Sequence, residues 1–201
     1  MRQKIIRWER GGALVINNPI YNEKAEILRE KGTDRAKFFR GQVDKYTWVD
    51  FGDSYLPSEL NAAYLWAQLQ IADKINENRL ESWNRYREVF ENIAKDGKIE
   101  LPQIPEECVH NAHMFYIKLK NLEERTRYIA YMKERGVQTV FHYVPLHSAP
   151  AGLKFGRFSG IDKYTTKESE RLVRLPLYYG LNKKEIDMVI QGTQSFFQEE
   201  I

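Results

Sequence analysis

The hydrophobic pattern along the chain predicts several helices. Apolar residues recur every three or four positions, as on one face of an amphipathic helix, in four stretches: 20–31, 58–96, 123–135 and 183–197. In the second stretch Trp83, Tyr86, Phe90 and Ile93 share one face, so we expect a long helix with that face buried. Three stretches are followed by a glycine that suits the end of a helix: Gly32, Gly97 and Gly136.

Short runs rich in β-branched and aromatic residues predict strands or extended segments between these helices: 13–16, 99–102, 114–119 and 137–144. A further short helix is expected over 166–175. Polar residues at 76–78 interrupt the pattern of the long helix, so we expect a kink or hinge there. Strands that alternate with helices indicate an α/β arrangement. We place a domain boundary near residue 97, which gives domains 1–96 and 97–201.

Composition and charge argue against several classes of protein. The chain has 201 residues, enough for one large or two small domains, and a formal net charge of +3. The charged residues are interspersed, which indicates a solvated surface and no nucleic-acid partner. Cys108 is single, so we expect no disulfide framework and a cytoplasmic location. No apolar run approaches the roughly 20 residues that a membrane helix needs, and the N-terminus does not match a signal peptide.

The stretch 38–70 combines an aromatic, glycine-containing segment with the start of a helix. Its many aromatic residues indicate an ordered, functional loop and not a flexible linker. Pro57 suits the first helical turn, and Ser58 offers a capping hydroxyl. The helix then shows one apolar stripe, made up of Ala62, Leu65, Leu69 and Ala72. An ordered loop docked on a helix N-terminus can hold an anion there.

Within this stretch the segment GDSYLPSELNAAYLWAQL resembles the motif GxNxRMSELQAAxxxxQL of the DegT/DnrJ/EryC1/StrS family. Members of that family are pyridoxal phosphate (PLP)-dependent aminotransferases of nucleotide sugars. The preceding EKGTDRAKFFRGQVDKYTW is similar to the branch that makes the amino sugar of enterobacterial common antigen. The segments AHMFYIKL, FHYVPLH and ESERLVRLPLYYGL also resemble the family, so the resemblance covers about residues 11–195.

The resemblance implies a fold and an activity. The fold would be the C-terminal part of a fold type I PLP-dependent transferase. In it, 1–96 would hold the end of the large domain and a long linking helix, and 97–201 the small α/β domain. The reaction would convert dTDP-4-keto-6-deoxy-D-glucose into dTDP-4-amino-4,6-dideoxy-D-galactose, with PLP as cofactor and glutamate as amino donor. Family members resemble dimers that share active-site residues, so a homodimer is expected.

The resemblance also assigns roles to particular residues. Lys4 falls at the position of the lysine that forms the Schiff base with PLP. Ser54 falls where many relatives carry an Asn that reaches the PLP phosphate of the neighbouring subunit, and its hydroxyl can still donate. Leu56 falls where many relatives carry an Arg, so we expect Arg40 or Lys45 to supply a cation to the substrate in its place.

Further substrate-binding residues are expected in two places. Tyr55 follows Ser54 directly. His142, Tyr143 and His147 match the family's HYxPLH loop, which looks like part of the sugar-nucleotide pocket. Two alternatives stay open: the histidines could be hydrogen-bonded structural residues of a tight loop, and the two candidate cations could be solvated surface groups. The histidines do not show the spacing of metal ligands, so no metal site is expected.

Members of the family are roughly twice as long as this chain. The resemblance places three parts of the PLP site in a first half that has no counterpart here: the ring that stacks on PLP, the Asp on its pyridinium nitrogen and most phosphate donors. A truncated or frame-shifted reading frame would explain this and the unusual first ten residues. The rival interpretations are an inactive fragment, an assembly module that needs a separate N-terminal half, and a sugar-nucleotide binder that uses His142 and Tyr143.

Overall fold

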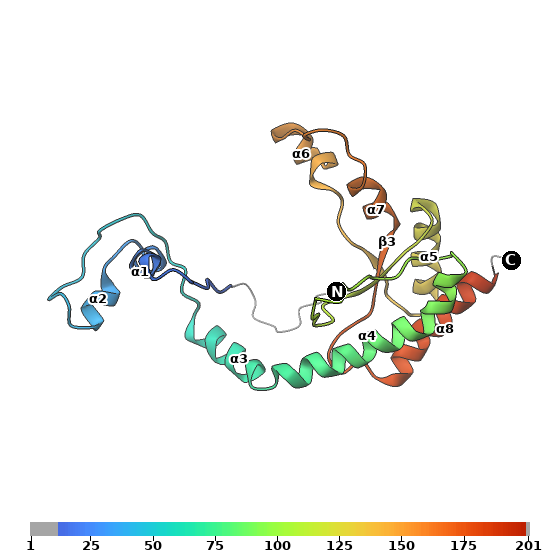
Figure 1. Cartoon of the computed structure of the whole chain (residues 1–201), viewed down its shortest axis with the longest axis horizontal. Helices are drawn as coiled ribbons and strands as arrows, with labels where there is room; N and C mark the ends of the chain where they lie inside the picture. The colour runs from blue at the N-terminus through green and yellow to red at the C-terminus, as the bar shows by residue number, and fades with distance from the viewer. Residues whose placement is uncertain (1–11, 200–201) are drawn as a thin grey trace. The chain divides into compact units, whose positions relative to one another are not determined.

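The structure, a computed structural model, describes residues 12–199 and divides into two compact units (Figure 1). We call residues 12–71 the N-terminal unit and residues 72–199 the C-terminal unit. The division lies before the long helix, whereas the sequence pattern placed a boundary after it, near residue 97. The assignment of the two parts of the chain to the large and small domains of a transferase stays a prediction.

The N-terminal unit consists of short helices joined by loops. Its elements are a 3-10 turn, η1 (Pro19–Tyr21), and the helices α1 (Asn22–Arg29), α2 (Arg35–Phe39) and α3 (Glu59–Leu69). The run 13–16 forms no strand, because no segment of the structure pairs with it. α2 lies in sequence that the pattern did not assign to a helix. Its five residues are too few to show a helical period.

A glycine turn folds the chain back after α1. Gly32 has a φ of +74°, and a Cβ atom there would lie 1.8 Å from the carbonyl oxygen of Asp50. Only glycine fits such a close approach of two backbone segments. The Gly32 N–H donates to the Ile27 carbonyl at 2.9 Å, which closes the end of α1 as the sequence predicted.

α3 has the predicted cap. The hydroxyl of Ser58 accepts a hydrogen bond from the Asn61 N–H at 3.3 Å, while Pro57 precedes the cap and lies outside the first turn. The long helical stretch is interrupted at residues 70–71, between α3 and α4, and not at 76–78. The polar residues at 76–78 lie inside α4, where Glu77 is exposed and the partly buried Asn78 accepts a hydrogen bond from the Gly180 N–H at 2.8 Å.

The C-terminal unit contains a three-stranded antiparallel sheet and the long helices that pack against it. Its strands are β1 (Phe115–Lys118), β2 (Val140–Phe141) and β3 (Leu172–Leu175), in the order β1-β3-β2. Its helices are α4 (Ala72–Lys95), α5 (Leu122–Glu134), α6 (Pro150–Phe155), α7 (Thr165–Arg171) and α8 (Lys183–Glu199), with a 3-10 turn η2 (Leu146–Ser148). The unit is therefore mixed α/β, as predicted.

The central strand β3 corrects the sequence prediction. The pattern placed a helix over 166–175, but the helix ends at Arg171 and Leu172–Leu175 form the strand. Buried and partly buried side chains alternate along it, which is the period of a strand with two different faces. A run of four residues is too short for its period to separate strand from helix, so its two pairing partners decide.

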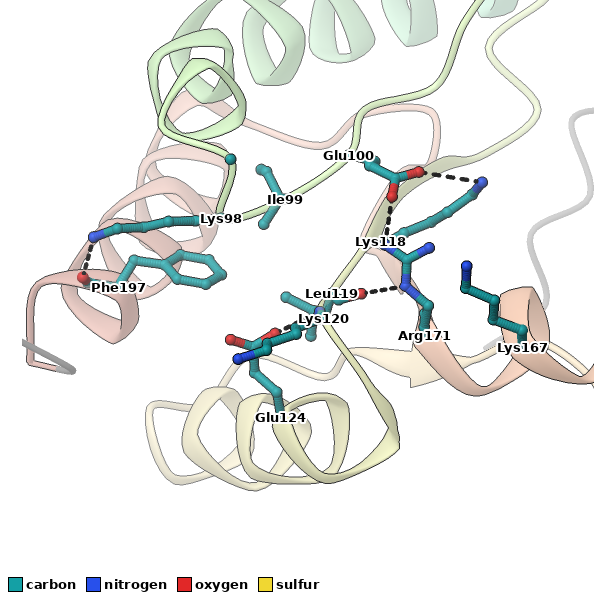
Figure 2. A pocket seen from close by; sticks show the side chains of 11 residues that line it. Lys98, Ile99, Glu100, Lys118, Leu119, Lys120, Glu124, Lys167, Arg171 and Phe197 are labelled. Atoms are coloured by element: carbon teal, nitrogen blue, oxygen red, sulfur yellow. Dashed lines mark hydrogen bonds and ion pairs between the residues drawn. The ribbon is translucent and has the colours of Figure 1, made fainter.

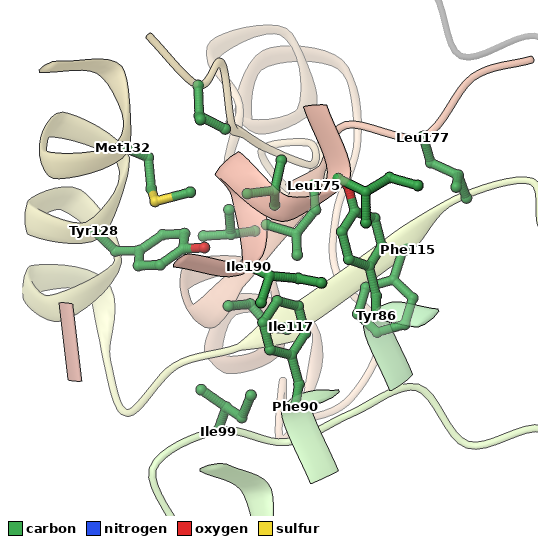
Figure 3. Packing of buried hydrophobic residues seen from close by; sticks show 14 of the residues in the cluster. Tyr86, Phe90, Ile99, Phe115, Ile117, Tyr128, Met132, Leu175, Leu177 and Ile190 are labelled. Carbon is green, nitrogen blue, oxygen red and sulfur yellow. The ribbon is translucent and has the colours of Figure 1, made fainter. Parts of the chain in front are cut away.

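The core lies on one face of this sheet, under α4, α5 and α8 (Figure 3). The pairs Phe115–Leu175 and Ile117–Val173 point into it, and all four side chains are buried. Figure 3 shows Tyr86 and Phe90 of α4 beside Phe115. The predicted inward faces of α4, α5 and α8 are thereby confirmed at their main positions: Trp83, Tyr86, Phe90, Met132, Ile186, Val189 and Ile190.

A buried arginine connects α4 to two loops at the edge of the core. Arg79 is 1% exposed, and its guanidinium donates to the carbonyl oxygens of Ala112 at 2.8 and 3.1 Å, of His113 at 2.7 Å and of Leu177 at 3.3 Å. No carboxylate among the described residues pairs with Arg79. Burial lowers its pKa, but a guanidinium stays charged, so these carbonyls stabilise a buried cation.

We predict that Arg79→Met lowers the free energy of unfolding by about 2–4 kcal/mol. Three carbonyl oxygens, two of them on buried residues, would lose their donor, at roughly 1–3 kcal/mol for each buried one. Removing the cost of a buried charge offsets part of this. Urea unfolding followed by circular dichroism measures the change. Arg85→Met is the matched control, because Arg85 is on the exposed surface of the same helix and should change stability by less than about 0.5 kcal/mol. Equal midpoints for the two variants would contradict the prediction.

Candidate functional site

The predicted site residues that the structure describes fall into two groups, one in each unit. The N-terminal unit holds Arg40, Lys45, Ser54 and Tyr55, and the C-terminal unit holds His142, Tyr143 and His147. Lys4, the predicted Schiff-base lysine, lies outside the described residues.

Ser54 and Tyr55 are positioned by backbone hydrogen bonds to the end of α1. The Asp53 N–H donates to the Leu28 carbonyl at 3.0 Å, and the Tyr55 N–H donates to the Arg29 carbonyl at 3.2 Å. The backbone N–H of Ser54 donates to the Asp53 carboxylate at 2.7 Å, which leaves the exposed Ser54 hydroxyl as its available donor. Backbone hydrogen bonds within the unit hold this segment, whereas aromatic side chains before it stay exposed, with Trp48 at 73% and Phe51 at 81%. That the segment is a functional loop stays a prediction.

Tyr55 lies on an open hollow of about 1290 Å³ in the N-terminal unit. Apolar residues such as Leu14 and Val15 line it together with the cations Lys24 and Arg29. Both cations already have carboxylate partners, and Glu26 also lines the hollow, so it offers a ligand mainly apolar surface. The predicted role of Tyr55 in substrate binding stays a prediction.

Arg40 is already paired within the unit. Its guanidinium donates to both carboxylate oxygens of Glu26, at 2.9 and 2.8 Å, and its Nε–H donates to Gln42 at 3.2 Å. This bidentate pair lowers the pKa of Glu26 and raises that of Arg40. A substrate anion would have to compete with Glu26, whereas Lys45 is exposed in a bend of the same loop. The geometry therefore favours Lys45 of the two predicted cations.

His142 and Tyr143 lie together in the loop after β2. Their ring centroids are 4.6 Å apart, and the hydroxyl of Ser169 donates to the Tyr143 carbonyl at 2.7 Å. Tyr143 is exposed, while His142 is partly buried and its Nδ1 has no hydrogen-bond partner among the described residues. His142 therefore has unused hydrogen-bonding capacity, as a binding residue needs.

His147 is held differently. Its Nε2 lies 2.9 Å from an oxygen of Asp162, and its ring centroid is 4.5 Å from that of Phe158. The same carboxylate accepts from the N–H groups of Thr165 and Thr166, at the start of α7, and the hydrogen bonds from Thr166 lower its pKa. These contacts are those expected of a structural histidine that ties η2 to α7, which was the alternative interpretation.

Sequence reasoning did not identify two neighbours of His142. Arg174, in the middle of β3, lies with its guanidinium carbon 6.0 Å from the Tyr143 ring centroid, and His113 lies just before β1. The pKa of His142 is lowered by partial burial and by the nearby Arg174 and His113. The pKa of His113 is lowered by partial burial and by Arg79 and Arg174. The local sequence held no signal for this placement, because Leu172–Leu175 become a strand only through pairing with β1 and β2.

A second cavity, of about 640 Å³, lies in the C-terminal unit and has a rim rich in cations (Figure 2). Lys118 lies 2.6 Å from Glu168 and 3.6 Å from Glu100, and Arg171 pairs with both of these carboxylates. Figure 2 shows Glu100 between Lys118 and Arg171. These paired charges neutralise each other, so the central cations of this cavity are not available to a ligand.

Among residues 12–199, no three His, Cys, Asp or Glu side chains converge as metal ligands would. None of the described helices combines the length and the apolar character that crossing a bilayer requires.

Comparison with known proteins identifies the family. The sequence profile of the DegT/DnrJ/EryC1/StrS aminotransferase family matches residues 2–194. The chain belongs to this family. The resemblance found in the sequence motifs is thereby confirmed, although its assignment to one branch of the family stays a prediction.

Individual relatives support the family and the fold. A dTDP-3-amino-3,6-dideoxy-alpha-D-galactopyranose transaminase of Aneurinibacillus thermoaerophilus is 25% identical over 92% of this chain and 47% of its own length. The structure of the sugar aminotransferase CalS13 of Micromonospora echinospora superposes with a TM-score of 0.78 at 17% identity, over 96% of this chain and 49% of that one. The structure of a putative sugar aminotransferase of Streptococcus pneumoniae in its PLP form superposes with a TM-score of 0.70 at 20% identity, over 92% of this chain and 46% of that one. The chain spans about half the length of the curated relatives it matches.

Members of this family use PLP, so the described residues can be tested against that cofactor. The one predicted PLP contact among residues 12–199 is Ser54, whose hydroxyl is exposed and whose N–H is taken by Asp53. One exposed hydroxyl does not make a phosphate cradle, which needs several convergent donors. The described residues therefore do not fit PLP by themselves.

We predict that stability falls when the pH decreases below about 6.5. Partial burial lowers the pKa of His110, His113 and His142 in the folded chain, so the unfolded chain binds more protons as the pH passes through its ordinary histidine pKa. This stability is fully present above that pH and is lost as the pH falls toward the folded values. The urea midpoints of unfolding at pH 7.5 and 5.5 measure this loss of stability. Carboxylates with a lowered pKa take up protons only at lower pH and do not contribute to the difference.

The control for this prediction is His142→Asn. It removes one of the three histidines, so the difference between the two urea midpoints should become smaller. Midpoints that do not change with pH in the unsubstituted chain would contradict the prediction.

Proposed function

We propose that this chain supplies one part of a PLP-dependent aminotransferase that acts on a nucleotide-linked keto sugar. The family match over residues 2–194 carries this proposal. The chain spans about half the length of its relatives, and its described residues do not complete a PLP site, so the remaining groups have to come from outside them. In this proposal Lys4 and Ser54 contact PLP.

We further propose the reaction that the sequence resemblance implies. The keto group of dTDP-4-keto-6-deoxy-D-glucose is replaced by an amino group from glutamate, which gives dTDP-4-amino-4,6-dideoxy-D-galactose for a cell-surface polysaccharide of the enterobacterial common antigen type, in the cytoplasm. The similarity of the segment around Lys45 to that branch supports this, as does the 25% identity to a transaminase of another dTDP-amino sugar. The substrate-binding residues would be Lys45, Tyr55, His142 and Tyr143, with Arg40 and His147 acting after release from their present partners.

An assembly role is the second candidate, and α3 favours it. None of the residues of α3 is buried, and Leu60 and Trp66 are 83% and 66% exposed. Exposed apolar side chains on one helix indicate a surface that another protein segment covers. A complementing N-terminal half or a second copy of the chain would provide such a cover.

We predict that the chain alone, mixed with PLP, gives no Schiff-base absorbance band that depends on Lys4. The reason is that its described residues offer only one of the groups that hold the cofactor. The spectrum between about 400 and 430 nm, compared with that of Lys4→Ala, measures this. Lys184→Ala, at an exposed position of α8, is the control for nonspecific reaction of PLP with lysines. A band that disappears only in Lys4→Ala would show that the chain binds PLP productively without another half.

We also predict that co-expression with the unmatched half of a relative restores function. The complex should show a Lys4-dependent band and should aminate dTDP-4-keto-6-deoxy-D-glucose with glutamate, and Lys4→Ala should abolish both. Sedimentation of the mixture reports whether the halves associate, and Trp66→Asp should weaken that association at least about tenfold if α3 is buried in it. A stable complex without amination would reject the enzyme proposal and leave the assembly role, and no complex would reject both.

A further inference from the structure

Arg174 is a cation in the middle of the face of the sheet that points away from the core. Its neighbours on β1 and β2 are Tyr116 and Val140, and its side chain is partly buried. One terminal nitrogen donates to the Phe141 carbonyl at 3.3 Å, while Nε is buried with no hydrogen-bond partner among the described residues. No carboxylate of residues 12–199 forms an ion pair with Arg174. Its charge is therefore not neutralised by the described part of the chain.

Side chains that can form hydrogen bonds lie near this guanidinium. His142 has an Nδ1 without a partner among the described residues, and the adjoining Tyr143 places its ring 6.0 Å from the guanidinium carbon. His113 comes from the segment before β1 and is exposed, so the cluster is open to solvent on that side. The four residues belong to three separate segments that the sheet brings together.

The position of His113 depends on the buried arginine described above. Arg79 donates to the His113 carbonyl at 2.7 Å, which fixes this residue at the edge of the cluster. Arg79 also adds a second guanidinium charge that no described carboxylate neutralises. Partial burial is the main cause of the lowered pKa of His113 and His142; Arg174 contributes to both shifts, and Arg79 contributes to that of His113. A partly buried cluster with this excess of positive charge attracts an anion.

We propose that Arg174, His113, His142 and Tyr143 form an oxyanion-binding site on this face of the sheet. The guanidinium provides the charge and a free terminal nitrogen, and the imidazole and phenol groups provide further donors. A phosphoryl group or a carboxylate has the matching chemistry. The binding of the oxyanion itself needs neither PLP nor another half of the enzyme. That the oxyanion belongs to a nucleotide sugar or to an amino donor rests on the proposed function.

The central cations in the cavity of Figure 2 differ from Arg174 because they have carboxylate partners. There Lys118 and Arg171 lie within ion-pair distance of Glu100 and Glu168, so the protein itself provides the anions. At Arg174 the described residues provide none. Only the second arrangement leaves a charge for a ligand to neutralise.

Calorimetric titration of the full chain with inorganic pyrophosphate, at constant ionic strength, tests the proposal. Arg174→Gln should weaken binding at least about tenfold, because a charge-assisted hydrogen bond is lost. Arg174→Lys should retain part of the affinity, because it keeps the charge but not the planar fork. Arg85→Gln, which removes an exposed cation on α4, should leave the affinity unchanged. Unchanged affinity in Arg174→Gln, or an equal loss in Arg85→Gln, would overturn the proposal.

The source of the oxyanion is distinguished by parallel titrations with pyrophosphate and with glutamate. Tighter binding of pyrophosphate in an Arg174-dependent manner assigns the site to a phosphoryl group, and tighter binding of glutamate assigns it to a carboxylate. Circular dichroism shows whether Arg174→Gln is folded. If it is not, His142→Gln replaces it, with a severalfold loss expected. Binding of neither anion to the folded chain would overturn the inference while leaving the proposed transamination to its own tests.

Discussion

The C-terminal unit depends on how one buried cation is satisfied. Arg79 cannot lose its proton, and its burial is tolerated because three carbonyl oxygens at two chain segments accept from it. Those carbonyls lie just before β1 and just after β3, which is the same end of this antiparallel pair, so the arginine fixes that end against α4. The same contact sets the position of His113. Core packing and the candidate oxyanion site are therefore linked through a single guanidinium.

The long helices were predictable because their signal is local and repeated. Trp83, Tyr86 and Phe90 recur over two helical turns, and no other arrangement buries all three on one face. β3 was not predictable in this way, because its four residues follow directly on the helix α7 without a turn signal. Its conformation is decided by pairing with β1, more than fifty residues earlier, and with β2. Short central strands owe their structure to contacts that the local sequence does not contain.

The same distinction holds for the candidate site. Lys45, Ser54 and the histidine loop were identified by resemblance, which compares stretches of sequence. The pairing of Arg40 with Glu26, across the turn at Gly32, and the placement of Arg174 beside Tyr143 are properties of the folded chain. A motif can therefore indicate which loop carries function, but the available charges in that loop follow from the fold. For this reason the sequence motif indicated Arg40, which is already paired with Glu26, and did not indicate Arg174.

Two groups of side chains lack a full set of stabilising partners among the described residues. α3 exposes apolar side chains that water solvates poorly, and Arg174 is a partly buried cation with no carboxylate partner. Each is unfavourable in isolation, and each is relieved by a group from outside the described residues: an apolar surface for one and an anion for the other. A chain that spans about half the length of its relatives is expected to show such features where a partner or substrate completes it. These two features mark the places in the described part of the chain where an apolar surface and an anion would be stabilising.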